Sequence, residues 1–340
     1  MPNSHPDHRP SATGRAALAA GGQTPAAYRP PEQEGEPSGG AGSADAGSGD
    51  GARRAGDDAG RKRNLDYPPA PEPLAVPVPD NHTHLDFRDG WVTVGVSDAL
   101  DAANAVGVSG VVQVGCDVES SRFAVAAAEA DVRVLAAVAI HPNDAPPLAE
   151  RGGLDDALAQ VDVLAAHPRV RAVGETGLDR FRTGPEGAAA QEYSFRRHID
   201  MAVRHGKALQ IHDREAHADI VRILGEEKLP DRVVFHCFSG DAELARICNE
   251  NGWYMSFSGT VTFKNSHGLR EALALADRNL VLVETDAPFL TPHPFRGRPN
   301  ASYLIPYTVR SMAGFLGEDV DGFCRDLASN TLAVYGRFDR

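Results

Sequence analysis

This chain of 340 residues is poor in cysteine and has no long apolar run. Its four cysteines, Cys116, Cys237, Cys248 and Cys324, are far apart and none belongs to a CxxC pair. Their spacing argues against a disulfide framework and against an all-cysteine zinc site. No segment reaches the roughly 18 apolar residues of a membrane span, and no apolar stretch follows a basic start as in a secretory signal. We therefore expect a soluble cytoplasmic protein with reduced thiols.

The chain also lacks an excess of basic residues. Lys and Arg number 34 against 47 Asp and Glu, which gives a net charge of −13. This balance excludes a broad basic surface that would coat nucleic acid. Catalysis on nucleic acid is still compatible with it, because bound cations and a few local arginines can offset phosphate charge at a site. The basic run 61–63 fits either a nucleic-acid contact or a solvated linker.

The first 78 residues contain almost no large apolar side chains. Pro, Gly, Ala, Ser and Asp dominate this stretch, as in the run 38–51. Such a composition buries too little surface to offset the entropy lost on ordering. We predict a disordered low-complexity tail over residues 1–78. The remaining residues, 79–340, are rich in Val, Leu, Ile and Ala and have the usual size of one α/β barrel domain.

Short runs of Val and Ile alternate with segments of helical periodicity from residue 78 onward. This alternation is typical of repeated βα units and a parallel sheet. Helices are expected over Ser97–Ala105, with Ser97 as the N-cap, and over Gln191–His205. Eight runs favour closure into a (β/α)8 TIM barrel, and a doubly wound open sheet is the alternative because strand order cannot be read from the sequence. The eight predicted strands lie near Val78–His84, Gly110–Val114, Arg133–Ile140, Val170–Gly174, Ala208–His212, Arg232–His236, Trp253–Phe257 and Asn279–Glu284.

Side chains of the kind that bind metals gather at the carboxyl ends of these strands. His82 and His84 are two residues apart, so they project to the same face of a strand and can hold one ion between them. One such pair does not define a metal site, since a single buried histidine is commonly a core residue. Many polar groups converging on one barrel mouth, however, would be costly without cations. The six predicted metal ligands, from five strand ends, are His82, His84, Glu175, His212, His236 and Asp286.

Six ligands exceed the four of a single tetrahedral ion, so we predict two divalent ions that share a carboxylate. The two histidines of the first strand and Asp286 lie on strands adjacent across the barrel closure and would hold the first ion. His212 and His236 would hold the second ion, with Glu175 as the bridge. Mixed nitrogen and oxygen ligands suit Mg, Mn or Zn, and ligand identity does not choose among them.

The motifs at these strand ends resemble those of the TatD family of metal-dependent deoxyribonucleases. The segments DNHTHLDF, AIHPND, GETGLD, QIHDREA, FHCFSG, SFSGTVTFKN and VETDAPFLTP occur in the family's order and spacing, from about Val78 to the C-terminus. The resemblance implies an amidohydrolase-like (β/α)8 barrel and a deoxyribonuclease activity that is exonucleolytic in some members. It places the family's metal ligands on the same six residues. The implied partner is DNA that is single-stranded or has free ends.

The predicted reaction is hydrolysis of a phosphodiester by a metal-activated water. Asp286 is the candidate general base, and Glu175 is the second candidate catalytic residue. Arg214 is the expected phosphate contact, because a guanidinium can hold two phosphate oxygens at once. An ion pair of Arg214 with Glu215 or Asp213 at the surface is an equally compatible interpretation. Further candidates for substrate contacts, from their position in loops at the mouth, are His141, Asp179, Ser239 and Arg298.

Two other function classes stay open at this point. A metal-activated water would also attack a carbonyl, so the same site could serve an ester or amide hydrolase such as a D-aminoacyl-tRNA deacylase, an activity described for some TatD relatives. Release of amino acid without nucleotide release from single-stranded DNA would identify that class. A non-enzymatic binding protein that kept the fold is the third class, and the complete ligand set argues against it.

Overall fold

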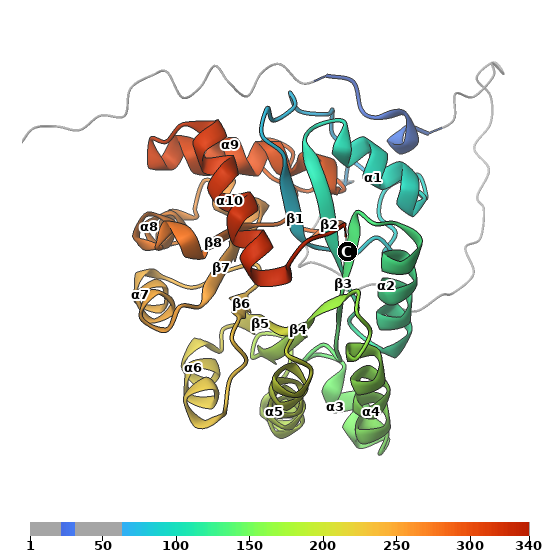
Figure 1. The fold of residues 1–340 in the computed structure, drawn as a ribbon, viewed down its shortest axis with the longest axis vertical. Helices are drawn as coiled ribbons and strands as arrows, with labels where there is room; N and C mark the ends of the chain where they lie inside the picture. Colours follow the sequence, from blue (N-terminus) through green and yellow to red (C-terminus); the bar gives the residue numbers. More distant parts are fainter. Residues whose placement is uncertain (1–21, 31–62, 340) are drawn as a thin grey trace, which may run out of the picture.

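The computed structural model describes residues 22–30 and 63–339. Eight parallel strands follow one another around a single sheet in chain order (Figure 1). Helices connect successive strands and cover the outside, as expected for right-handed βα units. The strands are β1 Val78–Thr83, β2 Val108–Val114, β3 Val134–Val138, β4 Val170–Asp179, β5 Ala208–Arg214, β6 Val233–Phe235, β7 Tyr254–Phe257 and β8 Val281–Val283.

Ten α-helices and five 3₁₀ helices occur in the described residues. The α-helices are α1 Val96–Asn104, α2 Val118–Ala130, α3 Ala145–Glu150, α4 Leu154–Ala165, α5 Ala188–His205, α6 His217–Glu226, α7 Ala242–Asn251, α8 His267–Leu275, α9 Ile305–Leu316 and α10 Val320–Tyr335. The 3₁₀ helices are η2 Ala26–Tyr28, η3 Pro185–Gly187, η4 Gly259–Thr262, η5 Arg278–Leu280 and η6 Ser302–Leu304. Within the described ranges, no helix is both long enough and apolar enough to cross a membrane.

The first and last strands meet just beyond β8. The Asp286 amide donates to the His82 carbonyl at 2.9 Å, and the His84 amide donates to the Ala287 carbonyl at 2.8 Å. Thr83 and Ala287 form a parallel bridge at the same place. The sheet is therefore a nearly closed (β/α)8 barrel, which confirms the predicted fold over the open-sheet alternative. Closure also brings the first and eighth strand ends together, as the predicted metal site requires.

The barrel interior is filled by side chains at one end and left to polar groups at the other. Residues such as Val112, Leu135 and Leu282 form one apolar cluster with Tyr335 from α10. Figure 1 looks at the end of the barrel that α10 covers. The Tyr335 hydroxyl lies 2.9 Å from the Gln210 amide nitrogen inside the barrel. The opposite end, where the strands finish, is the end left for a functional site.

Element boundaries differ from the predictions by a few residues. Helix α1 begins after Gly95 rather than at Ser97, and no side chain caps it. Helix α5 begins at Ala188 rather than Gln191, after the 3₁₀ turn η3, and ends at His205 as predicted, with Gly206 in the left-handed conformation as its C-cap. Strand β4 continues past the predicted end to Asp179, because its second half pairs with β5 through Thr176–Asp179.

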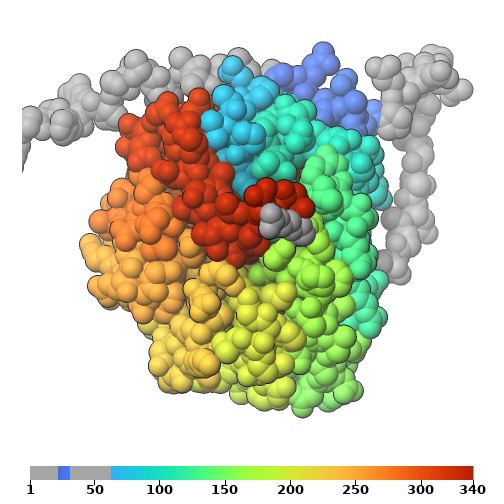
Figure 2. Space-filling view, in the orientation of Figure 1, coloured from blue at the N-terminus to red at the C-terminus, as the bar shows by residue number. Residues whose placement is uncertain are grey.

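Two parts of the predicted disordered tail have defined positions in the structure. Residues 22–30 and 63–77 pack on the barrel, and Tyr28, Tyr67 and Leu74 are buried. Figure 2 shows the blue segment 22–30 against the cyan start of the barrel. For these segments the prediction of disorder from composition was wrong. Two tyrosines and a leucine among the prolines bury enough apolar surface to hold them on the barrel. The other residues of the predicted tail, including the run 38–51 and the basic residues 61 and 62, lie outside the described residues.

Residues 63–77, here called the N-terminal strap, tie together two loops at the mouth of the barrel. The Arg63 guanidinium makes two hydrogen bonds to the Asp89 carboxylate, at 2.9 and 2.5 Å, and one to the Gly297 carbonyl at 2.7 Å. Asp89 belongs to the loop after β1, and Gly297 to the loop after β8. From the loop after β8, Arg298 in turn donates hydrogen bonds to the carbonyls of Asp66 and Tyr67 in the strap.

The buried His198 of α5 supports the end of β3. Its Nε2 accepts the Ile140 amide at 3.0 Å, and its Nδ1 donates to the Ser194 carbonyl at 2.7 Å. Burial lowers the pKa of His198 from 6.5 to about 4. The folded state therefore keeps a neutral imidazole at pH values where the unfolded chain binds a proton. Unfolding becomes more favourable as the pH falls from about 6.5 to about 4.

We predict that the His198→Gln substitution removes this part of the pH dependence. The wild-type free energy of unfolding should lose about 3 kcal/mol more than that of the variant between pH 7.5 and pH 4. Urea denaturation of chelator-treated protein at a series of pH values measures it. The exposed His267→Gln variant is the control and should follow the wild type. Parallel curves for wild type and H198Q would contradict the prediction.

Candidate metal centre

Four side-chain atoms surround one point at the barrel mouth. The Nε2 atoms of His82 and His84 lie 3.1 Å apart, and they lie 3.6 and 3.5 Å from Asp286 Oδ1. The Oε2 atom of Glu175 is 3.6 and 3.8 Å from the same two nitrogens. Ligands at about 2.1 Å from a tetrahedral ion are separated by roughly 3.4 Å. The spacing therefore fits a coordination shell, here called cluster one.

A second group of nitrogens surrounds the other oxygen of the same carboxylate. Glu175 Oε1 lies 2.6 Å from His212 Nδ1, 3.0 Å from His236 Nε2 and 3.1 Å from His141 Nε2. We call this group cluster two. One carboxylate thus has an oxygen in each cluster, which is the arrangement expected of a bridging ligand.

In His84 and His236, the Nδ1 atom lies on the side of the ring away from the cluster, and its hydrogen bond indicates where the ring carries a proton. His84 Nδ1 lies 3.0 Å from the Val114 carbonyl, which can only accept, so this nitrogen carries the proton. His236 Nδ1 likewise lies 3.2 Å from Glu284 Oε1, which already accepts the Cys237 amide at 2.7 Å. Burial would lower the pKa of both rings, but the acidic groups around them outweigh it and raise the pKa of His84 and of His236 well above the usual value. Each Nε2 therefore holds a proton toward the carboxylate oxygens, and a divalent cation bound between them would replace these protons. These residues fit divalent metal ions.

Charge within the site agrees with this assignment. Burial alone would raise the pKa of Glu175, but His236 and His141 outweigh it and hold the pKa well below its usual range. Burial would also raise the pKa of Asp286, and the hydrogen bond with His84 and the other imidazoles outweigh it and lower the pKa. Both carboxylates are therefore anionic at neutral pH and are available as ligands.

The backbone near Glu175 must approach the next strand very closely. Gly174 has a φ of 155°, and a Cβ there would lie 2.4 Å from the Gln210 carbonyl oxygen. Gly177 has a φ of 142°, and its Cβ would lie 2.1 Å from the His212 carbonyl oxygen. Only glycine fits these two positions, and they bring Glu175 and His212 into one site. Asp286 occupies the left-handed region, with a φ of 54°, in the turn that follows β8.

All six predicted ligands converge, and His141 joins them. The sequence analysis placed His141 among substrate contacts, whereas its Nε2 faces Glu175 within cluster two. Asp179 does not face open solvent but supports His212, with Oδ2 at 3.4 Å from His212 Nε2. The Asn143 amide holds the same carboxylate oxygen at 2.9 Å.

The other predicted substrate contacts differ in their surroundings. Arg214 stacks on Phe181, with its guanidinium carbon 4.0 Å from the ring centroid, and forms no ion pair in the described part of the chain. The ion pair considered for Arg214 is therefore not present there. Ser239 donates to the Asp213 carbonyl at 2.8 Å. Arg298 is bound to the N-terminal strap rather than free to contact a substrate.

Sequence reasoning missed two residues of the site. Glu284 is fully buried and orients His236. It stands two residues before Asp286, and this strand-end spacing was a usable signal. Cys116 follows β2, with its Sγ atom 3.7 Å from Glu175 Oε2 and 3.9 Å from His84 Nδ1. A lone cysteine gave no signal of its own.

Comparisons with known proteins agree with the fold and with a metal-dependent hydrolase. Residues 79–336 match the family model described as TatD related DNase. The "uncharacterized metal-dependent hydrolase TatD" of Mycobacterium tuberculosis is 46% identical over 261 residues, which cover 76% of this chain and 97% of that protein. The "3'-5' ssDNA/RNA exonuclease TatD" of Enterobacter lignolyticus is 31% identical over 248 residues, 70% of this chain and 92% of the relative.

A solved structure shows the same architecture. The crystal structure of a TatD homologue from Escherichia coli superimposes with a TM-score of 0.70 at 25% sequence identity, over 76% of this chain and 97% of that one. Fold, candidate site and relatives together define a metal-dependent hydrolase built on a TIM barrel. The chain belongs to the TatD family.

We predict that Glu175→Ala weakens metal binding at both clusters, because it removes an oxygen from each. The loss should exceed the roughly 10- to 100-fold that removal of an outer-shell partner costs. Titration of chelator-treated protein with Co²⁺ or Zn²⁺, followed by absorbance and calorimetry, measures affinity and stoichiometry. Glu129→Ala, on the outer helix α2, is the matched control. Unchanged affinity at either cluster would show that Glu175 is not the bridge.

Proposed function

We propose that this protein is a metal-dependent deoxyribonuclease that uses two divalent ions to hydrolyse phosphodiester bonds from a DNA end. The observation that carries the proposal is the Glu175 carboxylate, with one oxygen in each cluster of imidazoles. Paired ions bridged by a carboxylate suit in-line displacement at phosphorus, since both attacking and leaving oxygens need stabilisation. The exonuclease name of the Enterobacter lignolyticus relative supports the same substrate class.

Each cluster would hold one divalent ion, of Mg, Mn or Zn. Cluster one offers His82, His84, Asp286 and Glu175 Oε2. Cluster two offers Glu175 Oε1 with the three other histidines. When bound, the ions supply Lewis-acid polarisation of phosphate and a lowered pKa for water.

In this proposal Asp286 would take a proton from the attacking water. Its side chain is 14% exposed, whereas His82 beside it is fully buried, so Asp286 forms the solvent-facing edge of cluster one. Its lowered pKa keeps it anionic and able to accept a proton. His84 Nε2, 3.5 Å from Asp286 Oδ1, helps to fix the carboxylate in place.

Arg214 and Phe181 stand at the edge of the same site. Arg214 follows His212 by two residues on β5 and is paired in register with Asp179 of β4. Its guanidinium is free to contact phosphate, and the 59%-exposed Phe181 ring beside it offers a surface on which a base can stack. Both features suit a single-stranded polynucleotide better than a small ester.

We expect Asp286→Asn to reduce hydrolysis of single-stranded DNA by at least about 100-fold, the scale of general acid–base catalysis. The assay uses end-labelled oligonucleotide with Mg, Mn or Zn added back to chelated protein. Glu175→Ala should be equally impaired, while Asp200→Asn on the outer helix α5 serves as the control. Stepwise shortening of the label would establish exonucleolytic digestion.

Two results would count against the proposal. Normal activity of D286N would remove Asp286 as the base. Metal binding by the wild type without any cleavage of DNA would exclude a deoxyribonuclease. The same residues would then act on an ester or amide substrate, and release of amino acid from D-aminoacyl-tRNA is the direct test of that function.

A further inference from the structure

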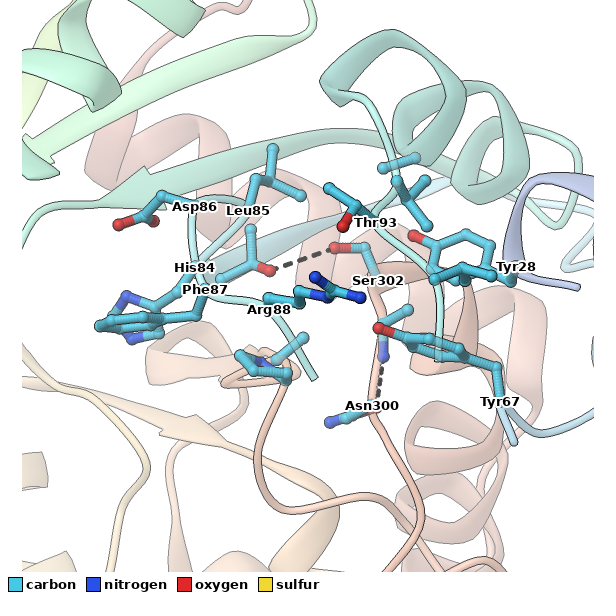
Figure 3. A pocket seen from close by; sticks show the side chains of 17 residues that line it. Tyr28, Tyr67, His84, Leu85, Asp86, Phe87, Arg88, Thr93, Asn300 and Ser302 are labelled. Carbon is cyan, nitrogen blue, oxygen red and sulfur yellow. Dashed lines mark hydrogen bonds between the residues drawn. The ribbon is translucent and has the colours of Figure 1, made fainter. Parts of the chain in front are cut away.

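A small pocket lies beside cluster one, between the loop after β1 and the N-terminal segments. Its volume is about 70 Å³, and His84 forms part of its wall. Figure 3 shows Arg88, Thr93 and Ser302 around the same space, with Tyr28 and Tyr67 on the far side from His84. Tyr28 lies outside the residues 79–336 that the family model matches. Part of this pocket is therefore supplied by chain beyond the family's common domain.

Two hydrogen-bond donors face this pocket without a partner. In residues 22–30 and 63–339, neither the Arg88 guanidinium nor the Tyr28 hydroxyl makes a hydrogen bond or an ion pair; Arg88 is exposed to solvent, whereas Tyr28 is only 5% exposed. Both groups point toward the space between Thr93 and Ser302 (Figure 3). Burial raises the pKa of the Tyr28 phenol, so it remains a protonated donor at neutral pH. The phenol oxygen opens onto the pocket, where water or a polar ligand can complete its hydrogen bonding.

Charges around the pocket favour an anion. Three carboxylates lie nearby. Asp89 is neutralised by the bidentate Arg63, and Asp86 accepts the Gln113 amide at 2.7 Å. The third, Asp98 of α1, lies close enough to Tyr28 to raise the pKa of its phenol. Asp86 also lies on the opposite side of the view from Tyr28 (Figure 3). The Arg88 charge is thus the one cation in the pocket wall that no described carboxylate offsets. A guanidinium and a phenol hydroxyl are both suited to phosphate oxygens.

The size of the pocket limits what enters it. A volume of about 70 Å³ is several times what one water needs, and far below the roughly 300–1,000 Å³ of sites for drug-sized ligands. A nucleobase or a whole nucleotide is too large. A single tetrahedral oxyanion, with the rest of its molecule outside the pocket, matches the space.

We propose that this pocket is a phosphate-binding subsite in which Arg88 and Tyr28 donate hydrogen bonds to phosphate oxygens. Its place beside His84 makes it a site for the phosphate that neighbours the scissile one in a polynucleotide, and this substrate role rests on the proposed function. Free inorganic phosphate carries the same chemistry and is the other source of ligand for the subsite.

The first test is independent of catalysis. Full-length protein, treated with chelator so that no metal binds phosphate, is titrated with inorganic phosphate by calorimetry and phosphorus NMR. Arg88→Met should weaken binding by about tenfold or more, equivalent to about 1.4 kcal/mol. Tyr28→Phe should weaken it several-fold. Arg122→Met on α2 and Tyr193→Phe on α5 are matched controls, and both should bind as the wild type does.

The second test separates the two sources of phosphate. With metal restored, R88M and Y28F should raise the KM for an oligonucleotide but leave hydrolysis of bis(p-nitrophenyl) phosphate, which has no neighbouring phosphate, unchanged. If the variants lose phosphate binding but keep the wild-type KM for the oligonucleotide, the pocket is a phosphate subsite that plays no part in binding the substrate.

Absence of phosphate binding in the wild type, or equal binding in R88M, Y28F and the controls, would overturn the subsite itself. If the wild type cleaves no DNA yet binds phosphate through Arg88 and Tyr28, the proposed nuclease function fails and the subsite stands. The two proposals are therefore judged by different measurements.

Discussion

The arrangement of the barrel mouth depends on one buried carboxylate. Glu175 is held between imidazoles from β1 and β5 and from the segments just after β3 and β6, and its two oxygens face different groups of nitrogens. A carboxylate in this position would be costly in a metal-free core, because burial opposes its charge. The nearby histidines offset that cost in part, and they lie where cations would complete the compensation. Strand ends, glycines and outer-shell hydrogen bonds are all arranged around this requirement.

Most of the fold could be predicted, because the strand runs and ligand motifs are local. The eight strands, their order of appearance and the six converging side chains follow from period-two spacing and from the rule that barrel sites lie at strand ends. What could not be predicted was which polar residue turns inward. His141 and Arg298 carry the same kind of local signal, yet one faces Glu175 and the other binds the N-terminal strap.

The N-terminal segments show the limit of composition as a guide. Their prolines and small residues suggest disorder, but Tyr28 packs edge-on against Tyr67 and Tyr303, with ring centroids 4.7 and 4.9 Å away. Both partners are far from Tyr28 in the sequence, Tyr303 by more than half the length of the chain, and no local pattern reveals such contacts. The strap that results joins the loops after β1 and β8, the same two strands whose ends form cluster one.

Closure of the barrel through residues 82–84 and 286–287 also sets an order of events during synthesis. About two hundred residues separate the two ends, and at roughly 5–20 residues per second the ribosome needs about 10–40 seconds to add them. Throughout that interval the histidine pair of β1 is present in the nascent chain without its carboxylate partner from β8. The complete ligand set of the candidate metal centre can therefore come together only after the eighth strand has emerged.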